Sequence, residues 1–205
     1  MGAASPGMIP APQGAGPSLL TSKVEEALAA RGLVCAFAEG AVAAKLRTLL
    51  AELAEKGQVS GELLNSYEPS LDFSTPPQME EVRTFIVVAA RSPAVKVRFH
   101  LEQGPFEALI PPTYISTSLC TETLRVLESV LGAAGHQVAR ARVPVKLLAV
   151  YSGLAQYGRN NIAYVRNLGS LVRLDAYCTD APLVANTQPP RGIWRLSSCP
   201  PCRNC

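Results

Sequence analysis

Three cysteines stand at a strict three-residue spacing at the end of the sequence. Cys199, Cys202 and Cys205 follow the pattern C-x2-C-x2-C in the stretch CPPCRNC. A loop with this spacing can wind around a cube-shaped cluster and bring a thiolate to three of its four corners, as in the bacterial iron–sulfur run C-x2-C-x2-C-x3-C-P. Structural zinc instead prefers two separated pairs of ligands. The triplet therefore favours a [4Fe–4S] cluster, with zinc or no metal as the alternatives.

The ligand set of such a cluster is incomplete in this chain, because a [4Fe–4S] cube takes four ligands. Cys35, Cys120 and Cys178 lie in apolar stretches, where a free cysteine is usually a small buried hydrophobe. His100 and His136 are isolated and distant in sequence. The simplest interpretation is that a longer protein has been cut inside its first cysteine run.

Glycines and amides gather in the sequence SGLAQYGRNNIAYV. Gly153 and Gly158 allow either a tight turn or a close approach of the backbone to a ligand. Arg159, Asn160 and Asn161 then place a cation and two amides at the tip of the loop. This segment is a candidate wall of a cofactor pocket. A turn from helix to strand, capped by asparagine, is the alternative.

Helices and strands must position these two segments. The leucine spacing and the glycines that follow it predict helices over 22–31, 42–56, 119–131 and 146–155. A capping box of Ser22 and Glu25 is predicted to begin the first of these helices. Runs of β-branched residues and the alternation of apolar with polar residues predict strands over 82–90, 94–102, 162–165 and 170–177. The second of these strands is predicted to pair with the first as a hairpin. Residues 136–145 are predicted to be extended, and 67–78 and 105–116 to be loops. The fold class is therefore α+β, a mixed α/β sandwich.

Composition excludes several classes of protein. The 205 residues are 48% hydrophobic and 17% charged, with a net charge of +3 and no run of Lys or Arg that would indicate nucleic-acid binding. The longest apolar run, FIVVAA, has the length of a strand and is too short to cross a membrane. Residues 1–17 are rich in Gly, Ala and Pro, lack the features of a signal peptide and are predicted to be a disordered leader. We expect a cytoplasmic protein whose clustered thiols serve metal or redox chemistry.

The order of the segments resembles a known family. The resemblance lies in four successive segments: GLAQYGRNN, GSLVRLDAYCTDAPL, a Pro-rich gap and CxxCxxC. In these segments the chain resembles the epoxyqueuosine reductase family, and more closely the related iron–sulfur double-cluster proteins. The resemblance is clear over 144–205 and fainter upstream, in FIVVAARSPAVKVRFH and IPPTY. It implies that 18–190 form a corrinoid-binding, flavin-reductase-like α/β domain with a cofactor pocket. Residues 191–205 would begin a ferredoxin-like [4Fe–4S] module that is truncated here.

The same resemblance implies a site and an activity. Seven residues would lie beside the corrinoid, a cobalamin: Gly153, Leu154, Tyr157, Gly158, Arg159, Asn160 and Asn161. The terminal cysteines would correspond to the first three ligands of the first cluster. Electrons would pass from the clusters, supplied by a redox partner protein, to cobalt and then to a small molecule or a modified nucleoside.

Two departures from the family pattern bear on the chemistry. The tRNA-modifying enzymes have a Lys-His-Thr-like sequence at the position of Arg159 to Asn161, and an acidic proton donor before the helix that leads into the glycine loop. The stretch between His136 and Lys146 contains no Asp or Glu, and arginine is a poor proton donor. Three interpretations stay open: a corrinoid-dependent reductase of unknown substrate, a non-catalytic iron–sulfur electron-transfer or binding protein, and an inactive truncated fragment.

Overall fold

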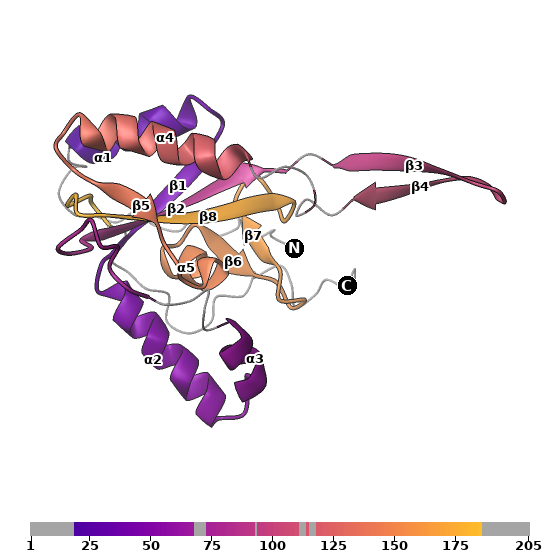
Figure 1. The fold of residues 1–205 in the computed structure, drawn as a ribbon, viewed down its shortest axis with the longest axis horizontal. Helices are drawn as coiled ribbons and strands as arrows, with labels where there is room; N and C mark the ends of the chain where they lie inside the picture. The colour runs from indigo at the N-terminus through magenta and orange to yellow at the C-terminus, as the bar shows by residue number, and fades with distance from the viewer. Residues whose placement is uncertain (1–18, 68–72, 93, 111–113, 115–117, 186–205) are drawn as a thin grey trace, which may run out of the picture.

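The fold is built around an antiparallel sheet with helices on both faces (Figure 1). The computed structural model describes residues 19–67, 73–92, 94–110, 114 and 118–185. The leader predicted at 1–17 and the segment at 191–205 lie outside the described residues. In chain order the elements are α1 (Leu19–Ala29), β1 (Val34–Glu39), α2 (Val42–Glu55), α3 (Gly61–Tyr67), β2 (Thr84–Arg91), β3 (Val95–Leu101), β4 (Gly104–Ile110), α4 (Ser118–Gly132), β5 (Val138–Arg140), α5 (Val145–Tyr151), β6 (Ala155–Tyr157), β7 (Ala163–Val165) and β8 (Val172–Thr179).

The main sheet has the strand order β1-β2-β8-β5, and each neighbouring pair is antiparallel. β2 is buried along its length except at Arg91, because both faces of the sheet are covered. Its alternate residues divide between two cores, as the period of two in a strand requires. Phe85, Val87 and Ala89 pack on the side of α5, whereas Ile86 and Val88 pack on the side of α1 and α4. The predicted α+β class is confirmed.

A β-hairpin of β3 and β4 projects away from this body (Figure 1). The strand predicted at 94–102 exists as β3, but its partner is β4 and the prediction that it pairs with the preceding strand is wrong. Residues 105–110, predicted as loop, belong to β4. Ser92 instead donates its backbone N–H to the Leu171 carbonyl at 2.9 Å, which keeps the end of β2 on the main sheet.

Several local predictions can be compared directly with the structure. α2, α4, β2 and β8 fall where predicted, and positive φ angles at Gly32 (69°) and Gly57 (66°) agree with the predicted helix stops. The capping box at Ser22 is wrong, because α1 already begins at Leu19. β1, α3 and β6 were not predicted. Among the described residues, no helix combines the length and the apolarity needed to cross a bilayer.

Candidate functional site

The glycine loop of the sequence is a helix end followed by a small hairpin. α5 ends at Tyr151, and Gly153 takes the left-handed conformation (φ 78°) that turns the chain into β6. Ser152 supports this end by donating its hydroxyl to the Ala149 carbonyl at 3.1 Å. β6 then pairs with β7 in antiparallel register, Tyr157 opposite Ala163. The sequence therefore folds as a helix-to-strand turn and then a tight hairpin.

The hairpin turn is specified by its two asparagines. Gly158 donates its N–H to the Ile162 carbonyl at 2.9 Å, and the N–H of Asn161 returns to the Gly158 carbonyl at 3.1 Å. Asn161 takes φ 59°, the left-handed conformation that ends a three-residue hairpin loop. The side chain of Asn160 accepts a bond from the Ile162 N–H and donates one to the Tyr164 hydroxyl, both at 3.2 Å. Both asparagines thus have a structural reason to be present.

Gly158 is required by packing inside the hairpin. A Cβ at this position would lie 2.6 Å from Asn160 Oδ1 and 2.6 Å from Tyr164 Cε2. The space above the glycine is therefore filled by side chains of the hairpin itself. A Cβ at Gly153 would meet nothing within 4 Å, so only its backbone angle demands glycine there.

An open groove of about 400 Å³ lies between α5, the hairpin turn and the start of β8. Of the seven residues proposed to line a cofactor pocket, Asn161 alone lines this groove. Its other lining residues are mostly apolar: Val145, Lys146, Ile162, Ala163, Ser170, Val172, Arg173 and Leu174. Apolar walls with a few polar groups are typical of small-molecule sites.

Lys146 is a groove residue that sequence reasoning did not select. It lies in the first turn of α5, is exposed, and donates from Nζ to the Asn161 carbonyl at 3.5 Å. Arg173 also borders the groove, but its guanidinium lies 3.6 Å from the Asp175 carboxylate. Alternation along β8 directs both of those side chains to the side of α4, away from Val172 and Leu174. No described residue that lines the groove carries a carboxylate.

The remaining predicted pocket residues lie elsewhere around the hairpin. Leu154 and Tyr157 pack against the core beneath α5. Burial raises the pKa of the Tyr157 phenol, so this group stays protonated at neutral pH. Arg159 is exposed at the turn and makes no ion pair with another described residue. The structure therefore brings the predicted segment together, but Leu154, Tyr157 and Gly158 point into the fold and Asn161 alone of the seven residues lines the groove.

The proposed cluster ligands Cys199, Cys202 and Cys205 lie outside the described residues. The three other cysteines are free and distributed over β1, α4 and β8. Cys178 Sγ lies 3.7 Å from the Ala139 carbonyl, in the core on the α5 side. No group of three metal-ligating side chains occurs within the described part of the chain.

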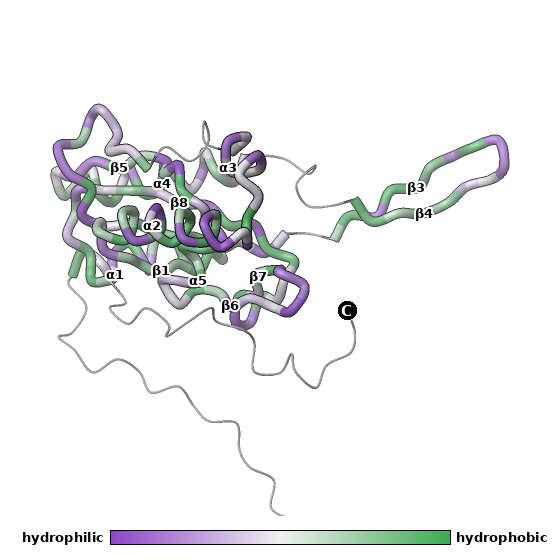
Figure 2. Tube along the Cα trace, turned by 90° about the horizontal axis from the view of Figure 1, so that it is seen from below, coloured by the Kyte–Doolittle hydropathy of each residue, from purple (hydrophilic) through white to green (hydrophobic). Residues whose placement is uncertain are grey.

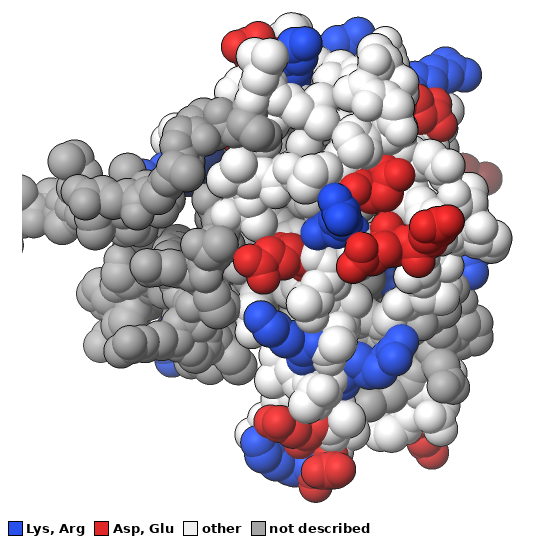
Figure 3. Space-filling model, turned by 90° about the vertical axis from the view of Figure 1, so that its left-hand side faces the viewer, with Lys and Arg blue, Asp and Glu red and all other residues white. Residues whose placement is uncertain are grey.

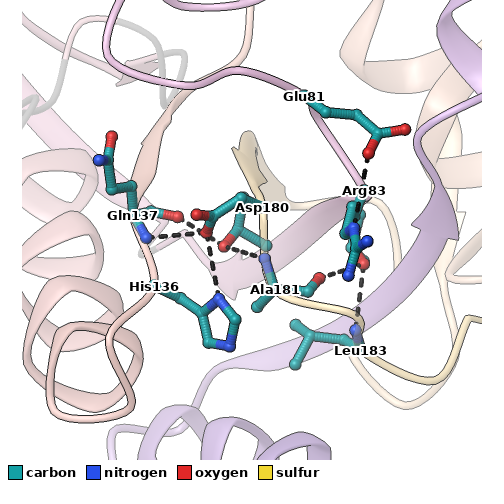
Figure 4. Close-up of polar contacts among 9 residues, drawn as sticks. Glu81, Arg83, His136, Gln137, Asp180, Ala181 and Leu183 are labelled. Atoms are coloured by element: carbon teal, nitrogen blue, oxygen red, sulfur yellow. Dashed lines mark hydrogen bonds and ion pairs between the residues drawn. The ribbon is translucent and has the colours of Figure 1, made fainter.

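His136 and Asp180 form a polar contact at the far end of the sheet (Figure 4). His136 Nδ1 lies 3.4 Å from Asp180 Oδ1, which also accepts the N–H of Gln137 at 2.8 Å. Asp180 follows β8, whereas the groove lies at the beginning of β8, about 23 Å away at 3.3 Å per residue. Asp180 therefore fixes the start of β5 to the end of β8 and is remote from the groove.

The side of the molecule at the left of Figure 1 carries charges of both signs. Figure 3 shows acidic groups around a basic group near the middle of this face, and no field of one sign covers it. A continuous positive field is the electrostatic feature that attracts nucleic acid. This face therefore offers no such attraction.

An antiparallel sheet covered by helices on both faces, with a groove at the turn after α5, defines an α+β fold that can be compared with known structures. No protein-family model and no curated protein sequence matches the chain. Solved structures of epoxyqueuosine reductase share its fold. A selenomethionine-labelled epoxyqueuosine reductase superposes with a TM-score of 0.61 and 16% identity, over 90% of this chain and 50% of the other.

Two further structures of the same enzyme agree with this result. The complex with an epoxyqueuosine-modified tRNA stem loop has a TM-score of 0.56 and 16% identity, over 89% of this chain and 50% of that one. The Bacillus subtilis enzyme, whose catalytic aspartate loop is swung out of the active site, has a TM-score of 0.51 and 14% identity, over 82% and 46%. The predicted resemblance is confirmed for the fold. The chain spans about half the length of these enzymes.

Proposed function

We propose that this chain is the cofactor-binding part of an iron–sulfur oxidoreductase related to epoxyqueuosine reductase. The observation that carries the proposal is the shared fold over 90% of the chain, combined with the C-x2-C-x2-C run that follows the described domain. Cys199, Cys202 and Cys205 would hold three corners of a [4Fe–4S] cluster in the first turn of a ferredoxin-like module. A redox partner protein in the cytoplasm would supply the electrons.

The groove is a suitable place for one edge of a corrinoid. Its walls include Val145, Ile162 and Leu174, which can cover an apolar macrocycle, and Asn161 and Lys146 offer an amide and an ammonium at the rim. At about 400 Å³ it is at the lower end of the range for small-molecule sites, so a larger ring would extend beyond it. Bound clusters and corrinoid would supply one-electron transfer and cobalt-centred reduction; the protein supplies position and shielding from water.

The proton donors that line the groove bear on the class of substrate. One of the solved reductases binds a modified tRNA stem loop, so a modified nucleoside is one substrate candidate, beside a small molecule. Opening an epoxide requires an acid within hydrogen-bond reach of the oxygen. No carboxylate lines the groove among the described residues, and the Lys146 ammonium is its one ordinary proton donor. We therefore propose a reductase whose substrate differs from epoxyqueuosine, with Lys146 as its positioned acid.

A second candidate is an electron-transfer or binding protein that performs no chemistry of its own. The absence of a carboxylate from 137–145, and from the groove among the residues that the structure describes, favours it, because reduction of most organic substrates needs a proton. An inactive truncated product is the third interpretation. The first two differ in whether a corrinoid binds, and the third predicts neither cofactor.

Anaerobic reconstitution with iron, sulfide and an excess of a small thiol, which can supply the fourth ligand, tests the cluster. We expect bound iron and sulfide with broad visible absorbance in the wild-type chain, and loss of both in a variant with serine at the three terminal cysteines. Cys35→Ser is the matched control, because Cys35 lies in β1 and should not contribute a ligand. A wild-type chain that stays colourless and free of iron would refute the cluster.

Titration with cob(II)alamin, followed by visible absorbance, tests the groove. We expect Lys146→Met and Asn161→Gly to weaken binding by at least about tenfold, the loss of one hydrogen bond or charge contact of about 1.4 kcal/mol. Lys45→Met on α2 is the control, because it removes a lysine outside the groove. Equal binding by all four proteins would exclude this groove, and no binding by any would favour the electron-transfer candidate.

A further inference from the structure

The open groove beside α5 carries three side chains that can donate hydrogen bonds to one ligand. Lys146 contributes an ammonium from α5, Asn161 an amide from the β6–β7 turn, and Ser170 a hydroxyl from the residues before β8. An ammonium is a donor only, and an amide and a hydroxyl each include a donor. The rest of the lining is mainly apolar, with Val145 and Leu174 among its members. A ligand in this groove therefore meets several donors and an apolar surface.

These donors have few partners within the described part of the chain. The Lys146 ammonium lies 3.5 Å from the Asn161 carbonyl, at the limit of a hydrogen bond. Neither the Asn161 amide nor the Ser170 hydroxyl bonds to another described residue. No carboxylate among the described residues lines the groove to neutralise the ammonium. All three side chains are exposed, so a ligand can reach them.

Positive charge is concentrated in the segment that forms the groove. Residues 137–174 contain no Asp or Glu, although the chain has 16 of them. The rest of the chain has more carboxylates than cations. The same segment carries the following cationic residues: Arg140, Arg142, Lys146, Arg159, Arg166 and Arg173. The part of the chain that builds α5, the β6–β7 hairpin and the start of β8 is therefore strongly basic.

Three exposed arginines bring positive charge to the border of the groove. Arg159 lies in the turn between β6 and β7, and Arg166 lies in the turn that follows β7. Figure 2 shows that this hairpin has hydrophilic turns. Arg91 reaches the second turn from β2: it stands opposite Val172, a groove residue, and its guanidinium donates to the Asn167 carbonyl at 3.2 Å. Cations from separate elements thus surround a groove that already holds an ammonium.

We propose that the groove is a phosphate-binding site whose ligand is a phosphate ester with an apolar part. The inference rests on the proposed function, in which the same groove takes a cofactor and a substrate, and it adds the charged group of the ligand. The Lys146 ammonium pairs with the phosphate, as lysine does in other phosphate sites. The Asn161 amide and the Ser170 hydroxyl donate to its other oxygens, and the apolar walls cover the rest of the ligand.

Phosphate matches this surface better than carboxylate does. A phosphate monoester carries close to two negative charges at neutral pH and has three terminal oxygens that accept hydrogen bonds. A carboxylate has one charge and two oxygens. Three donors and the surrounding arginines therefore complement the phosphate more fully. A lysine that binds the phosphate of a substrate also holds that substrate beside the proton donor that a reduction needs.

Phenyl phosphate is the probe, because it joins a phosphate to one apolar ring. It is titrated into the ¹⁵N-labelled full chain without iron, sulfide or corrinoid, and amide shifts are followed by NMR. We expect saturable shifts at 161–163 and 170–174, with a Kd at least about tenfold lower than that of benzoate, and none with the neutral benzyl alcohol. Binding to the wild type should weaken as NaCl is raised from about 50 to about 200 mM, because salt screens exposed charges.

Substitutions in the groove test the named donors. Lys146→Met should raise the Kd of phenyl phosphate by at least about tenfold, equivalent to about 1.4 kcal/mol, and Ser170→Ala by about threefold. Lys45→Met is the matched control, because it removes an exposed lysine from α2 outside the groove, and it should leave the Kd unchanged. The amide spectrum of each variant verifies that it is folded, and the salt titration of the wild type needs no variant.

Several results would overturn the proposal: no saturable shifts with phenyl phosphate, shifts confined to residues outside the groove, equal binding of benzoate or benzyl alcohol, or an equal loss in Lys146→Met and Lys45→Met.

A comparison of cobalamin with cobinamide, which lacks the phosphodiester of the nucleotide chain, identifies the source of the phosphate. If the phosphate belongs to the corrinoid, cobalamin should displace phenyl phosphate and bind at least about tenfold more tightly than cobinamide. If it belongs to a substrate, the two corrinoids should bind equally and leave phenyl phosphate in place. Phenyl phosphate binding without binding of either corrinoid would support the phosphate site and refute the corrinoid in the proposed function.

Discussion

Substitution of Gly158 by alanine tests how the glycine hairpin is held together. The glycine has no positive φ, so alanine is acceptable to the backbone and only the space above it matters. The new methyl group would lie 2.6 Å from both Asn160 Oδ1 and Tyr164 Cε2, closer than carbon atoms approach in folded proteins. One or both side chains must move, and the hydrogen bond between them at 3.2 Å would be lost.

The expected decrease in the free energy of unfolding is the difference between two opposing effects. Overpacking in a well-filled site costs about 1–3 kcal/mol. Alanine lowers the conformational entropy of the unfolded chain, which returns about 0.4–1 kcal/mol. We expect the free energy of unfolding to fall by about 1–2 kcal/mol, with a decrease in Tm of about 2–4 °C for each kcal/mol in a chain of this size.

Urea denaturation monitored by circular dichroism measures this change. Gly61→Ala is the control, because a Cβ there meets nothing within 4 Å and the position is helical. Adding Tyr164→Val to Gly158→Ala should recover part of the loss, because it removes the ring edge that the methyl group meets. If Gly158→Ala is as stable as the wild type, or if Tyr164→Val adds its full cost independently, the packing explanation is wrong.

Other substitutions separate backbone, polar and titration effects. Asn161→Gly should retain or raise stability whereas Asn161→Ala should lower it by about 1 kcal/mol, because φ is 59°; equal denaturation midpoints would refute this. Thr84→Val should cost about 1 kcal/mol, because it removes the hydroxyl that donates to the Ala181 carbonyl at 2.8 Å and accepts the Leu183 N–H at 3.2 Å, and leaves these two backbone groups with their bond to each other at 3.0 Å; a midpoint within error of the wild type contradicts it. Burial raises the pKa of the Cys35 thiol from 9.0 to about 12, so the native state keeps a proton that the unfolded state loses and stability falls as pH rises. Between pH 9 and 10 the free energy of unfolding should fall by about 1 kcal/mol more in the wild type than in Cys35→Ala, and parallel profiles would exclude this effect.

Strong local patterns allowed much of the body to be predicted from sequence. α2 and α4 repeat leucine at helical spacing over several turns, and Gly57 stops the first of them in a left-handed conformation. β2 is a continuous apolar run because both its faces are covered. In these elements one hydrophobic pattern continues over enough residues to exclude other types of secondary structure.

The β3–β4 hairpin was mispredicted because pairing is a tertiary property. Ser92-Pro93 ends β2 and resembles a turn, so β3 was assigned to the nearest preceding strand. Its true partner β4 contains Pro105, a residue depleted in strands, which made the sequence after Gly104 read as a loop. β6 has three residues, too few for a periodic signal, whereas β7 falls within the strand predicted at 162–165.

The candidate site shows the same division between local and distant information. Asn161 was found because a Gly-Arg-Asn-Asn run is conspicuous in the sequence. Lys146 was missed because it lies fifteen positions earlier, and only the return of the chain through Gly153 and β6 brings the turn back beside the first turn of α5. No spacing rule within either segment contains that contact.

The structure of the hairpin explains Gly153 and Gly158 without a bound ligand. Each has a sufficient reason within the chain: a backbone angle at Gly153 and the Tyr164 ring above Gly158. The same holds for Asn160, whose side chain is occupied within the turn by Ile162 and Tyr164. We therefore expect a ligand at this end of the sheet to be recognised by groups that the turn leaves available, among them the Asn161 amide and the Lys146 ammonium at the groove. Because Asn161→Gly keeps the backbone angle while removing the amide, a loss of corrinoid binding without a loss of stability would assign recognition to that side chain, and unchanged binding would show that the turn serves the fold alone.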